Sequence, residues 1–165
     1  MAVSDRRPVI RRAEERDFPA LVRLYREFHR FHVAGVPTRL CDPERVDEDE
    51  VVGMLRKIAG NERAALLVAE AEDRVVGLAE TYLKETEPSP YVVQRRYALL
   101  QSLVVTEAER GMGVGARLVA AVHQWARDRG ASEVEVETWE FPAGPLRFYE
   151  SLGYRTVKRR LARDL

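Results

Sequence analysis

Apolar residues recur at helical spacing in two stretches of the first sixty positions. The first stretch follows Asp17 and ends at Gly35, and its apolar residues are Phe18, Leu21, Val22, Tyr25 and Phe28. The second stretch ends at Gly60-Asn61, and its apolar residues are Val51, Val52, Leu55 and Ile58. It begins either at Asp42-Pro43 or at Asp47, where Glu50 would complete a capping box. The pattern predicts two amphipathic helices.

Runs of aliphatic residues predict the strands. A short strand begins at Val9, and residues 64–71 and 75–83 form the two arms of a hairpin. The polar stretch 84–96 separates this hairpin from a further strand over 97–105. That stretch is long enough to form a lid over a site.

The last third of the chain alternates helix and strand. A helical stripe of apolar residues ends at Gly130 and comprises Val114, Leu118, Val119, Val122, Trp125 and Ala126. A strand at 134–136, a short helix closed by Gly153 and a last strand over 154–161 follow. Early antiparallel hairpins and one late strand-helix-strand crossover predict an α/β fold with a mixed, mainly antiparallel sheet.

Length and charge narrow the classes of function. At 165 residues the chain is expected to form one domain, 1–165. Its 27 Lys and Arg balance 27 Asp and Glu, so no net field favours nucleic acid or a membrane as a partner. The lone Cys41 excludes an internal disulfide, and the first residues lack the apolar core of a signal peptide, so we expect a cytoplasmic protein. No cluster of His, Cys and carboxylates has the spacing of metal ligands, and no metal cofactor is expected.

A glycine-rich run, Arg110-Gly111-Met112-Gly113-Val114-Gly115, lies between a strand and a helix. With Ala116 it matches the dinucleotide fingerprint G-x-G-x-x-G/A, but residues 106–110 intervene after the strand, and too little chain remains for a Rossmann fold. Unshielded backbone N–H groups ahead of a helix N-terminus favour binding of a pyrophosphate. Alternatively, the glycines only allow close packing of helix on strand.

The spacing Arg110-x-x-Gly113-x-Gly115 resembles the Q/R-x-x-G-x-G/A loop of the GNAT superfamily of acyl-CoA-dependent N-acyltransferases. Residues 10–21, 100–105 and 148–154 also resemble that family, in the same order. The resemblance implies a GNAT-type sheet with a splayed strand pair that holds the CoA arm, acetyl-CoA as co-substrate, an amine acceptor and a homodimer. It implies CoA contacts from Leu103, Val104, Val105, Arg110, Gly111, Met112, Gly113, Val114, Gly115 and Ala116.

The resemblance also suggests catalytic residues. Tyr149 stands where the family motif has its proposed general acid, although an aromatic residue there can equally serve packing. The general base is not assigned by motif, because the family often carries acids where this chain has Gln101 and Ser102. Glu80, near the end of a central strand, is our candidate base; Glu137, Glu140, His29 and His32 are further candidates.

Two interpretations of function therefore stand. The first is an N-acetyltransferase that moves an acetyl group to a primary amine by direct attack in a ternary complex. The second is a non-catalytic CoA-binding or regulatory module, which the neutral Gln101 and Ser102 favour, together with Pro142 in place of a common Asn. The sequence leaves the acceptor open.

Overall fold

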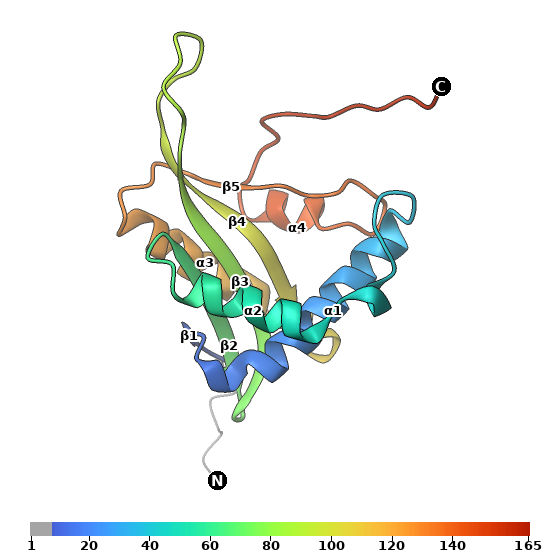
Figure 1. Ribbon diagram of the computed structural model, residues 1–165. Helices are drawn as coiled ribbons and strands as arrows, with labels where there is room; N and C mark the ends of the chain where they lie inside the picture. Colours follow the sequence, from blue (N-terminus) through green and yellow to red (C-terminus); the bar gives the residue numbers. More distant parts are fainter. Residues whose placement is uncertain (1–7) are drawn as a thin grey trace.

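A five-stranded sheet forms the centre of the computed structural model, which describes residues 8–165 (Figure 1). The strand order is β1-β2-β3-β4-β5, antiparallel except for the parallel pair β4 and β5, so the expected mixed, mainly antiparallel sheet is confirmed. The strands are β1 (Val9–Arg12), β2 (Ala64–Ala71), β3 (Arg74–Glu85), β4 (Arg96–Val105) and β5 (Val134–Val136). The helices are α1 (Phe18–Gly35), α2 (Glu48–Ala59), α3 (Val114–Arg127) and α4 (Leu146–Ser151), with 3-10 turns η1 (Glu15–Asp17), η2 (Pro43–Arg45) and η3 (Glu107–Glu109).

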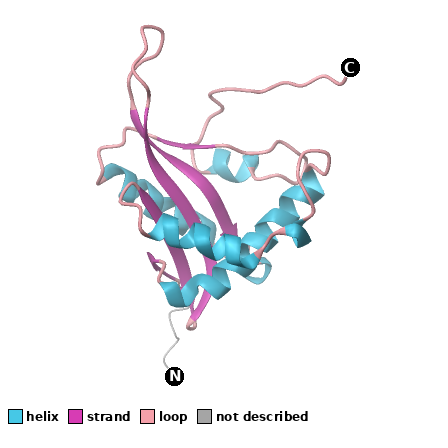
Figure 2. Cartoon of the chain, in the orientation of Figure 1, coloured by secondary structure: helices cyan, strands magenta, loops and turns pink. Residues whose placement is uncertain are grey.

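Helices cover both faces of the sheet (Figure 2). Along β2, Ala64, Leu66 and Val68 pack with α1 and α2, and the alternate residues Ala65, Leu67 and Ala69 pack with α3. Successive side chains of a strand point to opposite faces of the sheet. A strand that is covered on both faces therefore has a continuous run of apolar residues in its sequence. None of the helices within residues 8–165 is both long enough and apolar enough to cross a membrane.

An acidic residue stands at the N-cap of each of the first two helices, and only the second makes a side-chain cap. Asp17 precedes α1, and its carboxylate accepts hydrogen bonds from Arg11 (2.7 and 2.9 Å) and from the Glu14 N–H (2.8 Å). Asp47 caps α2 by accepting from the Glu50 N–H at 3.0 Å, so the second of the two expected starts is confirmed. The Asp42-Pro43 start is wrong for α2, because those residues form the separate turn η2.

A bulge in β4 shapes the region that matters most for the site. Glu80 pairs with Ser102 and Thr81 with Leu100, which leaves Gln101 as an extra, unpaired residue in β4. The parallel ladder with β5 ends at the same place, with Leu100 opposite Val136. A bulge bends its strand and increases its twist. Residues 101–105 therefore run on without β5 beside them, and the two strands diverge.

Two expectations about the chain are wrong. Residues 154–161 form no strand, because no other segment of residues 8–165 lies beside them to complete a ladder. The polar stretch 84–96 forms no lid over the glycine-rich run. It prolongs β3 and β4 into a hairpin arm that projects from the end of the sheet (Figure 1), and the glycines follow the opposite end of β4.

Candidate active site

The glycine-rich loop presents open backbone ahead of α3. Gly111 and Gly113 have φ values of 78° and 81°, a left-handed conformation that favours glycine, and a Cβ on either would meet no atom within 4 Å. Gly113 is the N-cap of α3 and supplies no side-chain cap. The first N–H groups of a helix lack intrahelical partners and carry partial positive charge. This end of α3 is therefore suited to an anion.

Gly115 has a different role from its two neighbours. A Cβ there would lie 3.2 Å from the Phe148 ring and 3.7 Å from a methyl group of Val105. The close-packing interpretation thus describes Gly115, whereas Gly111 and Gly113 border open space. Through this contact α4 is held against the start of α3 and the end of β4, which brings Tyr149 to the same end of the sheet as the loop.

Arg110 connects the loop to α1. Its guanidinium donates hydrogen bonds to the Val105 carbonyl at 3.0 Å and to the Glu27 carboxylate at 2.7 Å, and it lies 6.0 Å from the centre of the Phe31 ring. Two of its three nitrogens are therefore engaged within the protein. The side chain fixes the position of the loop relative to α1 in this structure.

Glu80 lies at the centre of a cluster of hydroxyl groups on the α1 face of the sheet. Its carboxylate accepts hydrogen bonds from Tyr25 of α1 (2.6 Å), Tyr82 of β3 (2.6 Å) and Ser102 of β4 (2.8 Å). The residue is only 4% exposed, and within residues 8–165 it forms no ion pair. Three hydroxyl donors satisfy an ionised carboxylate in place of a cation.

The two phenols of this cluster are held in their neutral form. Burial, followed by the nearby Glu80 carboxylate, raises the pKa of Tyr25 well above its ordinary value. The same two causes raise the pKa of Tyr82. Both hydroxyls therefore remain hydrogen-bond donors to Glu80 at neutral pH.

Tyr149 is buried in α4, and its ring contacts Phe148 and Tyr154 at centroid distances of 5.2 and 5.5 Å. Burial, and then Tyr154, raises the pKa of its phenol, so the proton is retained at neutral pH. The Tyr154 hydroxyl is hydrogen-bonded to His123 Nε2 at 2.8 Å. Within residues 8–165 the Tyr149 hydroxyl has no hydrogen-bond partner, and its oxygen is not fully buried.

The other candidate bases lie outside the Glu80 cluster. His29 and His32 are hydrogen-bonded to the carbonyl groups of Cys41 and Phe28, both at 2.8 Å. Glu137 and Glu140 are exposed, and Glu140 is 3.8 Å from Arg159. In the part of the chain that the structure describes, no three His, Cys, Asp or Glu side chains gather as ligands of a metal ion.

Sequence reasoning missed the partners of Glu80 and Arg110. Tyr25 belongs to the apolar stripe of α1, so the sequence pattern predicts a core residue there. Ser102 is a neutral residue at a position where the family often has an acid. Only Tyr82 carried a signal, because residues two apart on a strand share a face. Glu27 lies 83 positions from Arg110, and nothing in the pattern links them.

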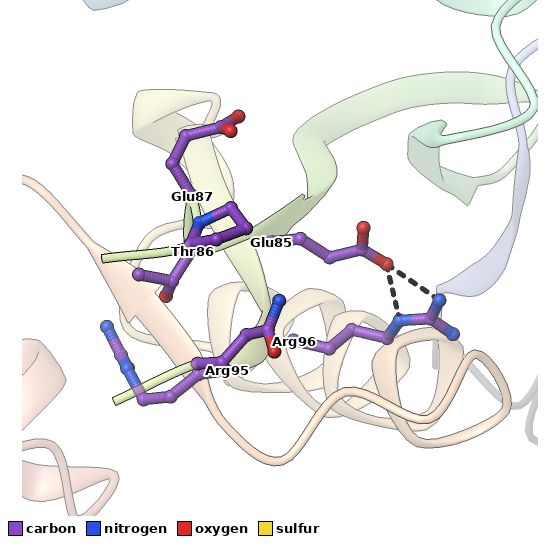
Figure 3. A pocket seen from close by; sticks show the side chains of 7 residues that line it. Glu85, Thr86, Glu87, Arg95 and Arg96 are labelled. Atoms are coloured by element: carbon purple, nitrogen blue, oxygen red, sulfur yellow. Dashed lines mark hydrogen bonds and ion pairs between the residues drawn. The ribbon is translucent and has the colours of Figure 1, made fainter. Parts of the chain in front are cut away.

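A polar cavity of about 530 Å³ lies at the base of the hairpin arm (Figure 3). Glu85 of β3 and Arg96 of β4, which are partners in the strand ladder, form an ion pair at 2.7 Å. The cavity is lined by Glu85, Thr86, Glu87, Pro88, Gln94, Arg95 and Arg96, none of which is a predicted site residue. The cavity is therefore separate from the candidate site.

Known proteins resemble this chain in sequence. The model of the acetyltransferase (GNAT) family matches residues 18–154. N-acetyltransferase 8F1 of Rattus norvegicus is 31% identical over 100 residues, which cover 61% of this chain and 43% of that protein. An aminoglycoside N(6')-acetyltransferase type 1 of Stenotrophomonas maltophilia is 33% identical over 92 residues, covering 53% of this chain and 56% of that protein. The match thus spans less than two thirds of either relative.

Solved structures share the fold. A variant of the BH1408 protein of Bacillus halodurans superposes with a TM-score of 0.86 over 95% of this chain and 99% of its own, at 23% identity. The aminoglycoside N-acetyltransferase AAC(6')-Iy in complex with CoA gives a TM-score of 0.77 over 100% and 99% of the two chains, at 17% identity.

Proposed function

The chain belongs to the GNAT family of acetyltransferases, and from that premise we propose that it transfers an acetyl group from acetyl-CoA to a primary amine. Two features of the structure carry this proposal, one suited to the donor and one to the acceptor. The open, left-handed backbone at Gly111 and Gly113 suits a pyrophosphate, and the buried carboxylate of Glu80 suits an amine.

The donor half of the site consists mainly of backbone. The N–H groups from Gly111 to Ala116 would bind the pyrophosphate, and the free edge of β4 at Leu103, Val104 and Val105 would pair with the pantetheine arm. A backbone N–H on that edge would also polarise the thioester carbonyl, where negative charge develops during attack. Arg110 orients the loop through Glu27 and Val105.

The acceptor half is centred on Glu80. Its carboxylate attracts a cationic amine, and it accepts the proton that the amine must lose, directly or through one water molecule. The neutral amine nitrogen then attacks the thioester carbon, and the carbon–sulfur bond breaks. Tyr149 donates its proton or a hydrogen bond to the departing sulfur. Acetylated amine and CoA are the products, and no covalent enzyme intermediate is required.

The Glu80–Ser102 hydrogen bond also favours catalysis over a non-catalytic CoA-binding module. The case for the module rests partly on the neutral residues Gln101 and Ser102 in β4. Glu80 on β3 lies opposite Ser102, so an acid from the neighbouring strand occupies the same side of the opening.

A screen for release of the CoA thiol tests the proposal. The panel should contain an aminoglycoside, a polyamine, free amino acids, a peptide with a free N-terminus and a lysine peptide; the aminoglycoside comes first because a relative is named for that activity. Cys41 is a free, exposed cysteine whose thiol is expected to add to the signal, so Cys41→Ser serves as the background control. Amine-dependent release is expected. Thermal stabilisation by acetyl-CoA without release from any amine would favour the module, and absence of stabilisation would contradict both interpretations.

A further inference from the structure

Arg110 and Glu27 form an ion pair between the glycine-rich loop and α1. Arg110 Nη2 lies 2.7 Å from Glu27 Oε1, and the two side chains are 46% and 34% exposed. Arg110 Nε donates to the Val105 carbonyl at 3.0 Å, whereas Nη1 has no hydrogen-bond partner within residues 8–165. Arg110 directly precedes Gly111 in the loop. The guanidinium is therefore next to the proposed pyrophosphate site and has capacity for a second anion.

Glu27 belongs to a face of α1 that contacts Arg110 through two side chains. Phe31 lies four residues further along the helix, and residues four apart share a helix face. The centre of the Phe31 ring is 6.0 Å from the Arg110 guanidinium. The same ring lies 5.4 Å from the ring of Phe141, in the segment that follows β5. This face of α1 thus contacts the chain beyond both of the diverging strands, and Arg110 is its contact on the β4 side.

The Glu27 carboxylate lies where it opposes the binding of an anion by Arg110. Carboxylates and phosphates are both strong acceptors for a guanidinium, so the two compete for the same group. An exposed ion pair contributes little net stability, because water screens it. A pyrophosphate carries more charge than one carboxylate and can also bind the N–H groups at the start of α3. We therefore expect a pyrophosphate to displace Glu27 from Arg110.

We propose that Glu27 is a displaceable counter-ion of Arg110, which holds the guanidinium before CoA binds and releases it to the pyrophosphate of CoA. The Val105 carbonyl keeps the Arg110 side chain beside the loop during this exchange. Glu27 is then a positioning residue that lowers the affinity for CoA, and a lower affinity favours release of the CoA product. The inference rests on the proposed CoA site and extends that site to a residue of α1.

Isothermal titration calorimetry with CoA tests the exchange. Glu27→Gln keeps the shape of the side chain and an oxygen that can accept a hydrogen bond from Arg110, but it removes the charge. We expect this variant to bind CoA about two- to fivefold more tightly at low salt, the fold-change that corresponds to one exposed ion pair. The gain should shrink at about 0.5 M NaCl, because salt screens exposed charges. Unchanged or weaker binding by Glu27→Gln, or a gain that salt does not reduce, would overturn the inference.

Glu44→Gln is the matched control for net charge. Glu44 forms another exposed ion pair with α1, at 2.6 Å from Arg30, and its replacement changes the net charge by the same amount. This variant should bind CoA as the parent chain does. An equal gain in affinity for Glu44→Gln would assign the effect to net charge and contradict a specific role of Glu27.

A double-mutant comparison locates the effect on Arg110. In an Arg110→Gln background, Glu27→Gln should no longer raise the affinity for CoA, because the group for which the two anions compete is gone. A gain that persists without Arg110 would refute the exchange. If the parent chain binds CoA and Glu27→Gln binds it no more tightly, this inference alone fails. If the parent chain does not bind CoA, the proposed CoA site fails with it.

Discussion

Glu80 and Ser102 face each other across the β3–β4 ladder, and the Ser102 hydroxyl donates a 2.8 Å hydrogen bond to the Glu80 carboxylate. The pair lies beside the bulge at Gln101, where β4 turns away from β5. The strand register therefore determines which side chain meets the buried acid.

The first prediction concerns Glu80. Glu80→Gln should lower kcat/KM for the amine selected by the thiol-release screen by about 10²- to 10⁴-fold, the usual contribution of general acid–base catalysis. Acetyl-CoA binding, measured by calorimetry, should be unchanged because Glu80 is not one of the residues proposed to bind acetyl-CoA. Glu137→Gln removes an exposed carboxylate at another candidate position and serves as the matched control. An equal loss of kcat/KM in both variants would count against Glu80 as the general base.

The second prediction concerns Tyr149. Tyr149→Phe retains the ring that packs on Phe148 and Tyr154 but removes the hydroxyl. Burial raises the pKa of this phenol, so its effect as an acid should lie at or below the lower end of the usual range. A fall in kcat of about tenfold to a hundredfold is expected, with KM for acetyl-CoA unchanged. An unaltered kcat in steady-state kinetics would remove Tyr149 from the mechanism.

The third prediction compares two glycines. Gly113→Ala places a Cβ on a residue with φ of 81°, at a cost of roughly 1–2 kcal/mol. Because the free loop can relax out of this strained conformation and the CoA-bound loop cannot, the cost should appear as acetyl-CoA binding weaker by about tenfold, since 1.4 kcal/mol corresponds to a factor of ten. Gly53→Ala also meets no atom within 4 Å, but it lies inside α2, where alanine should stabilise the fold by about 0.5–1 kcal/mol. Calorimetry that finds equal acetyl-CoA affinity in the two variants would contradict the proposed loop.

The fourth prediction concerns pH and the start of α1. The hydrogen bonds from Arg11 hold the pKa of the Asp17 carboxyl below its ordinary value, against the opposing effect of burial. The unfolded chain therefore binds a proton here more readily than the folded chain does, so this stabilisation is complete above about pH 4 and is lost as pH falls through the folded pKa. Asp17→Asn should lower the free energy of unfolding by about 1–3 kcal/mol at pH 7.

Urea unfolding at several pH values measures this effect. The difference between Asp17→Asn and the parent chain should narrow as pH falls below about 4. Asp164→Asn, at an exposed position in the C-terminal segment, should change stability little at any pH. A difference for Asp17→Asn that stays constant across the acidic range would show that the carboxylate charge is not its cause.

Much of the fold could be predicted because periodicity alone reports which faces of helices and strands are buried. The 3.6-residue stripe after Asp17 and the runs at 64–71 and 75–83 correspond to α1, β2 and β3. The last strand could not be predicted correctly, since 154–161 has a strand pattern but a strand also needs a neighbour. Alternation in one segment says nothing about whether its partner lies in the same chain.

The candidate site was less predictable than the fold. The loop around Gly113 is contiguous in sequence, so its spacing was sufficient to identify it. The Glu80 cluster draws side chains from α1, β3 and β4, and its geometry depends on the extra residue Gln101, which the hydropathy pattern does not mark. Long-range contacts of this kind follow from register rather than from local propensity.

The bulge also bears on how such an opening could arise or disappear during evolution. Deletion of Gln101 would leave Glu80 opposite Ser102 and Thr81 opposite Leu100, yet it would remove the bend from β4. We expect a straightened β4 to continue alongside β5, closing the space between them. In genetic terms, we expect a single codon to separate an open sheet from a closed one.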